Sequence, residues 1–173
     1  YWATKRKYPY EIRWIIPRIQ ASRGAELMEL VRVLDEQMNN TSLILLFQFG
    51  GKNLLFPGDA QIESWEYALK EAGDANANQA VLAQTDFYKV GHHGSRNATP
   101  KTLWNLFAKK GVGAGSLQTM LSTRVGKHGS PSKNTEVPRA TLLKELSENS
   151  RLFDTETLGG TSTASFVMTT VEE

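Results

Sequence analysis

The sequence predicts an α/β fold in which helices flank a mixed β-sheet. Short apolar runs that suit buried strands alternate along the chain with segments whose apolar residues recur at helical spacing. Two of the apolar runs are joined by Gly50-Gly51, and paired glycines favour a tight hairpin because they accept positive φ angles. With 173 residues, the chain suits a single domain over residues 1–173 that buries its own core.

The composition excludes several classes of site and protein. The chain has no cysteine, so disulfides, thiolate metal sites and cysteine nucleophiles are ruled out. A content of 40% hydrophobic and 22% charged residues is typical of a soluble globular chain. No stretch approaches the roughly 18 apolar residues that span a bilayer, and the first residues do not resemble a signal peptide. We therefore expect a cytoplasmic protein with no membrane segment in this chain.

Positive charge gathers at the start of the chain. Residues 1–23 hold six Lys or Arg against one Glu, whereas the rest of the chain holds 14 against 17 acidic residues. Such a segment could contact a phosphate backbone or an acidic surface. Trp14, Ile15 and Ile16 interrupt it with core-like side chains, which favours a merely solvated edge.

The first predicted elements are a helix and a hairpin. Apolar residues at helical spacing predict an amphipathic helix over 25–38. The runs at 42–49 and 52–56 predict the two strands of the Gly50-Gly51 hairpin. The turn at 57–60, Pro-Gly-Asp-Ala, ends the second strand.

A second helix, a loop and a buried strand follow. An apolar stripe predicts a helix over 60–72, and GDANANQA at 73–80 is interpreted as a surface loop. The apolar run at 86–90 predicts a strand that leads directly into two histidines. Thr99 and Pro100 are typical of a helix start, with Thr99 as N-cap and Pro100 at the first helical position.

The last third of the chain is predicted to continue the alternation. A short strand is expected over 116–123 and a helix over about 136–148. Runs at 151–155 and 162–170, separated by Gly159-Gly160, predict a final hairpin.

Two of the predicted strands end in groups that can bind metal. LLFPGDA ends at Asp59, and FYKVGHHGS ends at His92-His93. Strand ends on one edge of a sheet are where α/β proteins gather ligand-binding residues. Carboxylates and neutral imidazoles are both metal ligands. Each residue also has a simpler interpretation: Asp59 could be the N-cap of helix 60–72, and strand-end histidines usually serve only in hydrogen bonding.

Three segments resemble, in order, the second half of a metallo-β-lactamase-fold hydrolase. They are NNTSLILLF (39–47), NLLFPGDA (53–60) and KVGHHGS (89–95). The likeness is greatest to the branch that includes the hydrolase domain of the competence protein ComEC, and it covers roughly residues 39–170. The resemblance implies one half of an αββα sandwich, in which two αβ halves pack sheet against sheet.

The resemblance also implies roles for single residues. Asp59 matches the aspartate that bridges two metal ions, and one histidine of the pair matches the last metal ligand. We assign His93 to the metal and place His92 either beside the substrate phosphate or behind the metal ligands. The reverse assignment of the two histidines stays open, because adjacent residues of a strand point to opposite sides. Ser95 either hydrogen-bonds an anionic group or only stabilises the turn. His128 either contacts substrate at the site mouth or is an ordinary loop histidine.

This ligand set implies two divalent metal ions, with zinc favoured and manganese or iron as alternatives. Two such ions about 3.5–4 Å apart would activate a water for hydrolysis. In this branch the expected substrate is a phosphodiester or another phosphate ester, and the basic start favours nucleic acid. We expect Asp59 and the histidine pair on neighbouring strand ends, with an oxygen about 5–7 Å from an imidazole nitrogen.

The chain departs from the family in one large respect. The His-x-His-x-Asp-His motif is absent, and so is the separate histidine ligand before the bridging aspartate. We therefore expect a longer polypeptide or a partner chain to supply the first half, and this segment alone to be inactive. The inner sheet face would then be exposed, with Leu43, Leu45, Phe47, Leu55 and Phe56 on it. The alternative function is a metal-free scaffold or interaction module that keeps the fold without catalysis.

Overall fold

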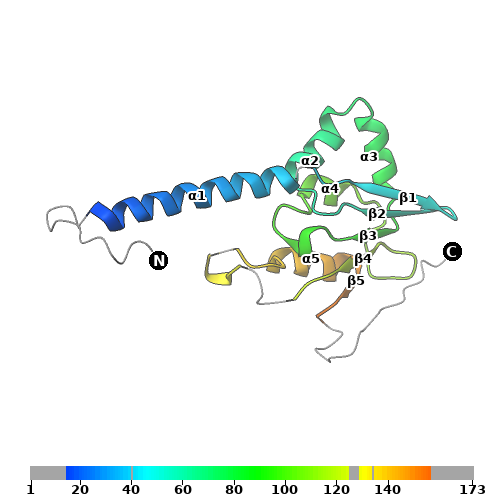
Figure 1. Cartoon of the computed structure of the whole chain (residues 1–173). Helices are drawn as coiled ribbons and strands as arrows, with labels where there is room; N and C mark the ends of the chain where they lie inside the picture. Colours follow the sequence, from blue (N-terminus) through cyan, green and yellow to red (C-terminus); the bar gives the residue numbers. More distant parts are fainter. Residues whose placement is uncertain (1–14, 40, 125–128, 134, 157–173) are drawn as a thin grey trace. The chain divides into compact units, whose positions relative to one another are not determined.

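A computed structural model describes residues 15–39, 41–124, 129–133 and 135–156. The chain divides between Met38 and Asn39 into two units. The described part of the first unit is the helix α1 (Ile15–Asn39), drawn in blue in Figure 1, whose last residue already belongs to the second unit. The helix is confirmed but begins earlier than predicted, with Pro17 in its first turn, where proline is tolerated. Leu27 and Leu30, two members of its predicted apolar stripe, are exposed.

The second unit is built on a five-stranded sheet in the order β1-β2-β3-β4-β5 (Figure 1). The hairpin strand β1 is antiparallel to β2, whereas β2, β3, β4 and β5 run parallel to one another. The predicted α/β class, a mixed sheet with flanking helices, is therefore confirmed. The strands are β1 (Leu45–Phe49), β2 (Lys52–Phe56), β3 (Phe87–Lys89), β4 (Gln118–Leu121) and β5 (Arg151–Asp154).

The predicted hairpin forms for the predicted reason. Gly50 and Gly51 both have positive φ angles, 56° and 73°, as a tight two-residue turn between antiparallel strands requires. The turn sets the register, in which Phe49 pairs with Lys52 and Leu45 with Phe56. The first strand begins at Leu45 rather than at residue 42.

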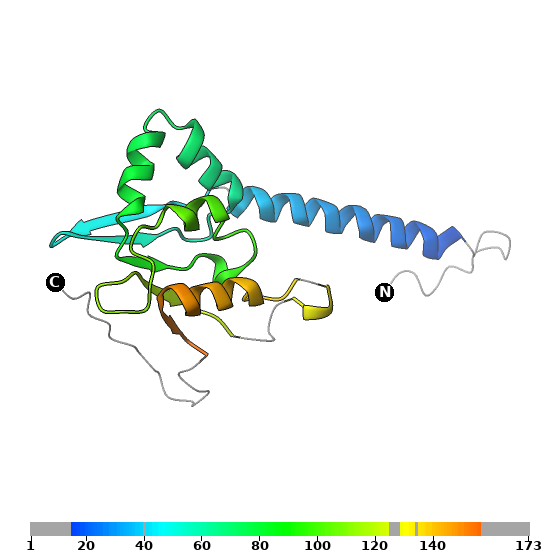
Figure 2. The ribbon, with the colours of Figure 1, turned by 180° about the vertical axis from the view of Figure 1, so that it is seen from behind.

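The helices of this unit cover one face of the sheet (Figure 2). They are α2 (Ile62–Glu66), which continues as a π-helical turn (Tyr67–Glu71), α3 (Ala75–Ala83), α4 (Lys101–Leu106) and α5 (Ala140–Asn149). Leu55 of β2 and Tyr88 of β3 are neighbours in the register and both are fully buried. They share one hydrophobic core with a buried side chain from each helix: Trp65, Leu82, Trp104 and Leu146.

The surface loop predicted at 73–80 is wrong, because α3 begins at Ala75. The amide side chains of its polar residues hold the helix against the preceding segment. Asn78 Nδ2 donates to the carbonyl oxygen of Ala68 at 2.9 Å, and Gln79 Nε2 donates to that of Leu69 at 2.6 Å. These bonds satisfy carbonyls near the end of a helical segment, so polar residues that suggested a loop stabilise a helix.

Two predicted helix caps are also wrong. The helix after Asp59 begins at Ile62 with Gln61 at the N-cap position, so Asp59 does not cap it. Pro100, not Thr99, precedes the first residue of α4. The Thr99 hydroxyl instead makes a buried 2.8 Å hydrogen bond with the Tyr88 hydroxyl. The predicted helix over 136–148 is confirmed in kind but begins at Ala140.

The opposite face of the sheet carries exposed apolar side chains. Leu45 and Phe47 of β1 are exposed there, Phe47 at 52%. Leu43, which was predicted for this face, is exposed too, but it precedes β1 and lines a hollow with Ser64 and Tyr67 of the helical side. The Phe47 ring contacts Phe56, which in turn contacts Phe87 of β3. The helices of the second unit contribute their buried side chains to the core on the other side of the sheet. We call the present side the open face; its exposed part lies at β1, and Phe87 in β3 is buried. Leu55 was wrongly assigned to it, because its side chain points to the helices and is fully buried.

The final predicted hairpin is described only in part. Its first strand is confirmed as β5, which pairs with β4, whereas residues 162–170 lie outside the described residues. Among the helices that the structure describes, none has the length and apolar character needed to cross a membrane.

Tyr88 should make stability depend on pH in the alkaline range. Burial raises the pKa of its hydroxyl from 10.0 to about 12. The contribution of the buried neutral hydroxyl to the unfolding free energy is therefore complete below pH 10. It falls by up to about 2–3 kcal/mol as the pH rises from 10 through 12. We predict that Tyr88→Phe reduces the fall in unfolding free energy between pH 10 and 12. Urea unfolding across that range measures it, with the exposed Tyr67→Phe as control; equal slopes in all three proteins would contradict the assignment.

Candidate functional site

The two motif turns lie at the same edge of the sheet. β2 ends at Phe56 and leads into the turn with Asp59, while β3 ends at Lys89 and leads into the turn with His92 and His93. Because β2 and β3 are parallel neighbours, their carboxyl ends meet at one edge. The expectation of neighbouring strand ends is confirmed, and the distance between the Asp59 oxygen and the imidazole nitrogen stays a prediction.

The backbones of the two turns touch. The amide of His92 donates to the carbonyl oxygen of Gly58 at 3.3 Å. A Cβ added at Gly91 would lie 2.8 Å from that same oxygen and 3.2 Å from Cγ of Pro57. Real Cβ atoms essentially never approach an oxygen so closely, so the absence of a side chain at Gly91 permits the contact.

The histidines lie in a left-handed turn rather than in an extended strand end. The φ angles of His92, His93 and Gly94 are 41°, 53° and 76°. The turn is closed by hydrogen bonds from the Gly94 amide to the Gly91 carbonyl and from the Ser95 amide to the His92 carbonyl. Positive φ costs a residue with a side chain roughly 1–2 kcal/mol, and such strain gathers at functional sites.

His93 is held in one tautomer. Its Nδ1 lies 2.8 Å from the carbonyl oxygen of Ser122, the residue that follows β4. A carbonyl oxygen only accepts, so Nδ1 carries the hydrogen and Nε2 of the neutral ring keeps its lone pair. Because the ring is exposed, that lone pair is accessible. Histidines that bind metal are usually oriented in this way by a backbone carbonyl or a carboxylate.

His92 has a different environment. Its ring is half-buried, and Nδ1 lies 3.5 Å from Nε2 of the buried Gln61, at the start of α2. This contact is at the outer limit of a hydrogen bond, so it orients the ring less firmly than the Ser122 carbonyl orients His93.

Asp59 is exposed and close enough to Lys89 for its charge to act there. Burial lowers the pKa of the Lys89 ammonium, and the negative charge of Asp59 opposes this shift. Lys89 is half-buried, and its register places it on the same side of the sheet as the buried Phe87, away from the helices. The sequence interpretation missed Lys89, although it opens the KVGHHGS segment.

Ser95 and His128 have different outcomes. The Ser95 hydroxyl oxygen is buried and has no hydrogen-bond partner within the described residues, so there it does not hold the turn through its side chain. His128 lies outside the described residues. A contact that the sequence did not indicate joins the turn to α5, because the Arg139 amide donates to the Gly94 carbonyl at 2.9 Å.

The donors fit a divalent metal in kind but not in number. Asp59 offers a carboxylate and His93 an imidazole nitrogen, both suited to zinc. A catalytic zinc takes about three protein ligands, and the described residues contain no group of three or more His, Cys, Asp or Glu that could hold an ion. These residues thus offer part of a coordination sphere.

No protein-family model, curated protein or solved structure matches the chain.

The contact between the turns can be tested at Gly91. We predict that Gly91→Ala lowers the unfolding free energy by about 1–3 kcal/mol, because the added methyl group would push Gly58 and Pro57 away. Gly73→Ala is the control, since a Cβ there meets nothing within 4 Å. Urea unfolding of both variants gives the comparison. Equal stability of the two would mean that the turns are not in close contact.

Proposed function

We propose that the second unit is half of a metallo-β-lactamase-fold hydrolase that cleaves a phosphodiester or another phosphate ester. The observation that carries this proposal is the backbone contact between the Asp59 turn and the His92-His93 turn at one sheet edge. It joins two turns about thirty residues apart in sequence, one carrying a carboxylate and the other two imidazoles, in the order that the resemblance implies.

Each residue has a separate role in the proposed site. When bound, two divalent metal ions, zinc or alternatively manganese or iron, would supply a water of lowered pKa and stabilise negative charge on the phosphate. Asp59 would bridge the two ions, and His93 would bind one of them through Nε2. The Ser122 carbonyl favours His93 over His92 for this role, because it fixes the His93 ring and leaves Nε2 available. His92 would then face the substrate phosphate.

The remaining ligands would come from the first half of the fold. Its docking surface would be the open face of the sheet, where Leu45 and Phe47 are exposed and the Phe47 ring contacts Phe56, which contacts the buried Phe87. An apolar sheet is the partner that this face suits, because two sheets that pack face to face bury the side chains between them. This arrangement would also cover the half-buried Lys89.

Asp59 tests the metal role directly. In the assembly of this chain with its first half, we predict that Asp59→Ala lowers phosphodiester hydrolysis at least about 100-fold and removes bound metal, because the bridging carboxylate is lost. Asp74→Ala, a second exposed aspartate, is the matched control. Turnover of a chromogenic phosphodiester and elemental analysis of the purified proteins give the readouts. Normal turnover with full metal content in Asp59→Ala would exclude the proposed role.

The open sheet face tests the missing half. We predict that the chain alone has no metal-dependent hydrolase activity and associates, with itself or with the first half, through this face. Phe47→Lys should weaken association at least about tenfold, because it places a charge in an apolar contact. Tyr67→Lys, also exposed but on the helical side, should not. Sedimentation measures both; an active monomer that binds two metal ions tightly would contradict the proposal.

A further inference from the structure

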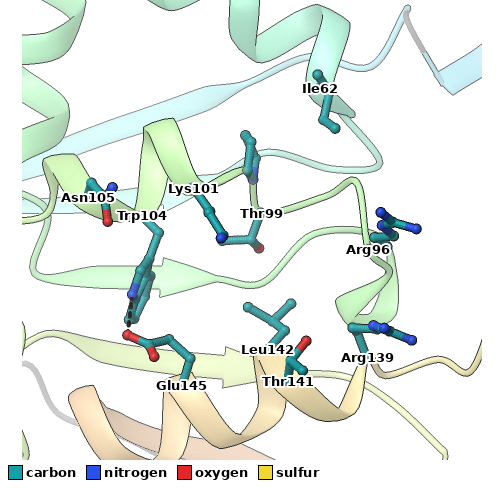
Figure 3. A pocket seen from close by; sticks show the side chains of 11 residues that line it. Ile62, Arg96, Thr99, Lys101, Trp104, Asn105, Arg139, Thr141, Leu142 and Glu145 are labelled. Carbon is teal, nitrogen blue, oxygen red and sulfur yellow. Dashed lines mark hydrogen bonds between the residues drawn. The ribbon is translucent and has the colours of Figure 1, made fainter. Parts of the chain in front are cut away.

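A groove of about 880 Å³ lies between α4 and α5, on the helical side of the second unit (Figure 3). Three of its lining residues are basic: Arg96, Lys101 and Arg139. One is acidic, Glu145, whose Oε1 accepts hydrogen bonds from Trp104 Nε1 at 2.9 Å and from Asn149 Nδ2 at 3.0 Å. The lining therefore carries more positive than negative charge.

The positive charge is only partly neutralised within the described residues. Arg139 pairs with Glu136, which lies outside the lining, at 2.8 Å. Arg96 and Lys101 are exposed and form no ion pair with any residue that the structure describes. A concave surface of one sign raises the local concentration of ions of the other sign.

The groove begins at the histidine turn. Arg96 follows that turn directly in sequence, and the Arg139 amide is bonded to the Gly94 carbonyl. Figure 3 shows Arg96 and Arg139 at one end, Trp104 and Glu145 at the other, and Lys101 between them. Cationic groups thus lead from the candidate site along the groove.

We propose that this groove binds the phosphate groups of a phosphate-bearing ligand through Arg96, Lys101 and Arg139. A guanidinium group can donate two parallel hydrogen bonds to two oxygens of one phosphate, and a lysine adds a single positive charge. Trp104 is the aromatic side chain among these lining residues, and because it is buried it leaves little ring surface on which a base could stack. Recognition therefore acts on phosphates and is independent of base sequence. Binding in this groove requires no metal ion. The inference rests on the proposed function in one respect only, that the reacting end of the ligand would lie at Asp59.

The test measures binding to the full chain in EDTA. A fluorescent oligodeoxythymidine is one ligand, and inorganic phosphate, as competitor and by calorimetry, is the other. Arg96→Gln and Lys101→Gln should each weaken binding about 5–10-fold, and for the oligonucleotide they should reduce the salt slope by about one. Lys144→Gln is the control, because Lys144 lies on α5 outside the lining and pairs with Glu148. Circular dichroism and urea unfolding verify that each variant is folded.

The two ligands separate the sources of the phosphate. If oligonucleotide binding weakens in both groove variants, the ligand is a nucleic-acid strand. If only the binding of inorganic phosphate weakens in them, the ligand is a small phosphate ester. Either outcome supports the inference. Binding that is absent, or unchanged in both folded variants, overturns it. Loss of hydrolysis in Asp59→Ala with groove binding intact is expected, whereas normal hydrolysis in Asp59→Ala would count against the metal role alone.

Discussion

The candidate site depends on the close approach of the backbone at Gly91 to the carbonyl oxygen of Gly58. Parallel pairing of β2 and β3 brings both turns to one edge, but a side chain at position 91 would hold them apart. With that contact made, the His92 amide reaches the Gly58 carbonyl, and the position of Asp59 relative to the histidines is set by backbone. Side chains then only orient what the backbone has already brought together.

The face of the sheet that the helices cover also holds this edge in place. Tyr88 in β3 is fixed by burial and by its bond to Thr99, and Trp65 Nε1 donates to the Ala98 carbonyl at 3.2 Å. The segment after the histidines is therefore attached to the core at two adjacent residues. Gly94 is confined as well, because a Cβ there would lie 3.0 Å from both Leu121 and Pro138. Rigid support of this kind lets a turn keep positive φ at residues with side chains.

The sequence predicted those features whose causes are local. The Gly50-Gly51 hairpin, β3 and the pairing of the two motif turns follow from turn chemistry, apolar runs and the rule for parallel strand ends. The face on which Leu55 lies could not be predicted, because NLLF is a continuous apolar run without alternation and a shift of one residue exchanges the faces. The helix α3 depends on bonds from Asn78 and Gln79 to carbonyls ten residues earlier. The His93 tautomer depends on Ser122, twenty-nine residues later.

Three surfaces meet at the histidine turn, and this convergence explains how one segment can serve several contacts. The sheet edge carries Asp59, the open face carries Lys89, and the helical side begins where Arg139 bonds to Gly94. Arg139 joins two of these surfaces, because its backbone amide holds the Gly94 carbonyl while its side chain lines the groove. The same turn that presents His93 at the sheet edge therefore also fixes where Arg139 enters the groove.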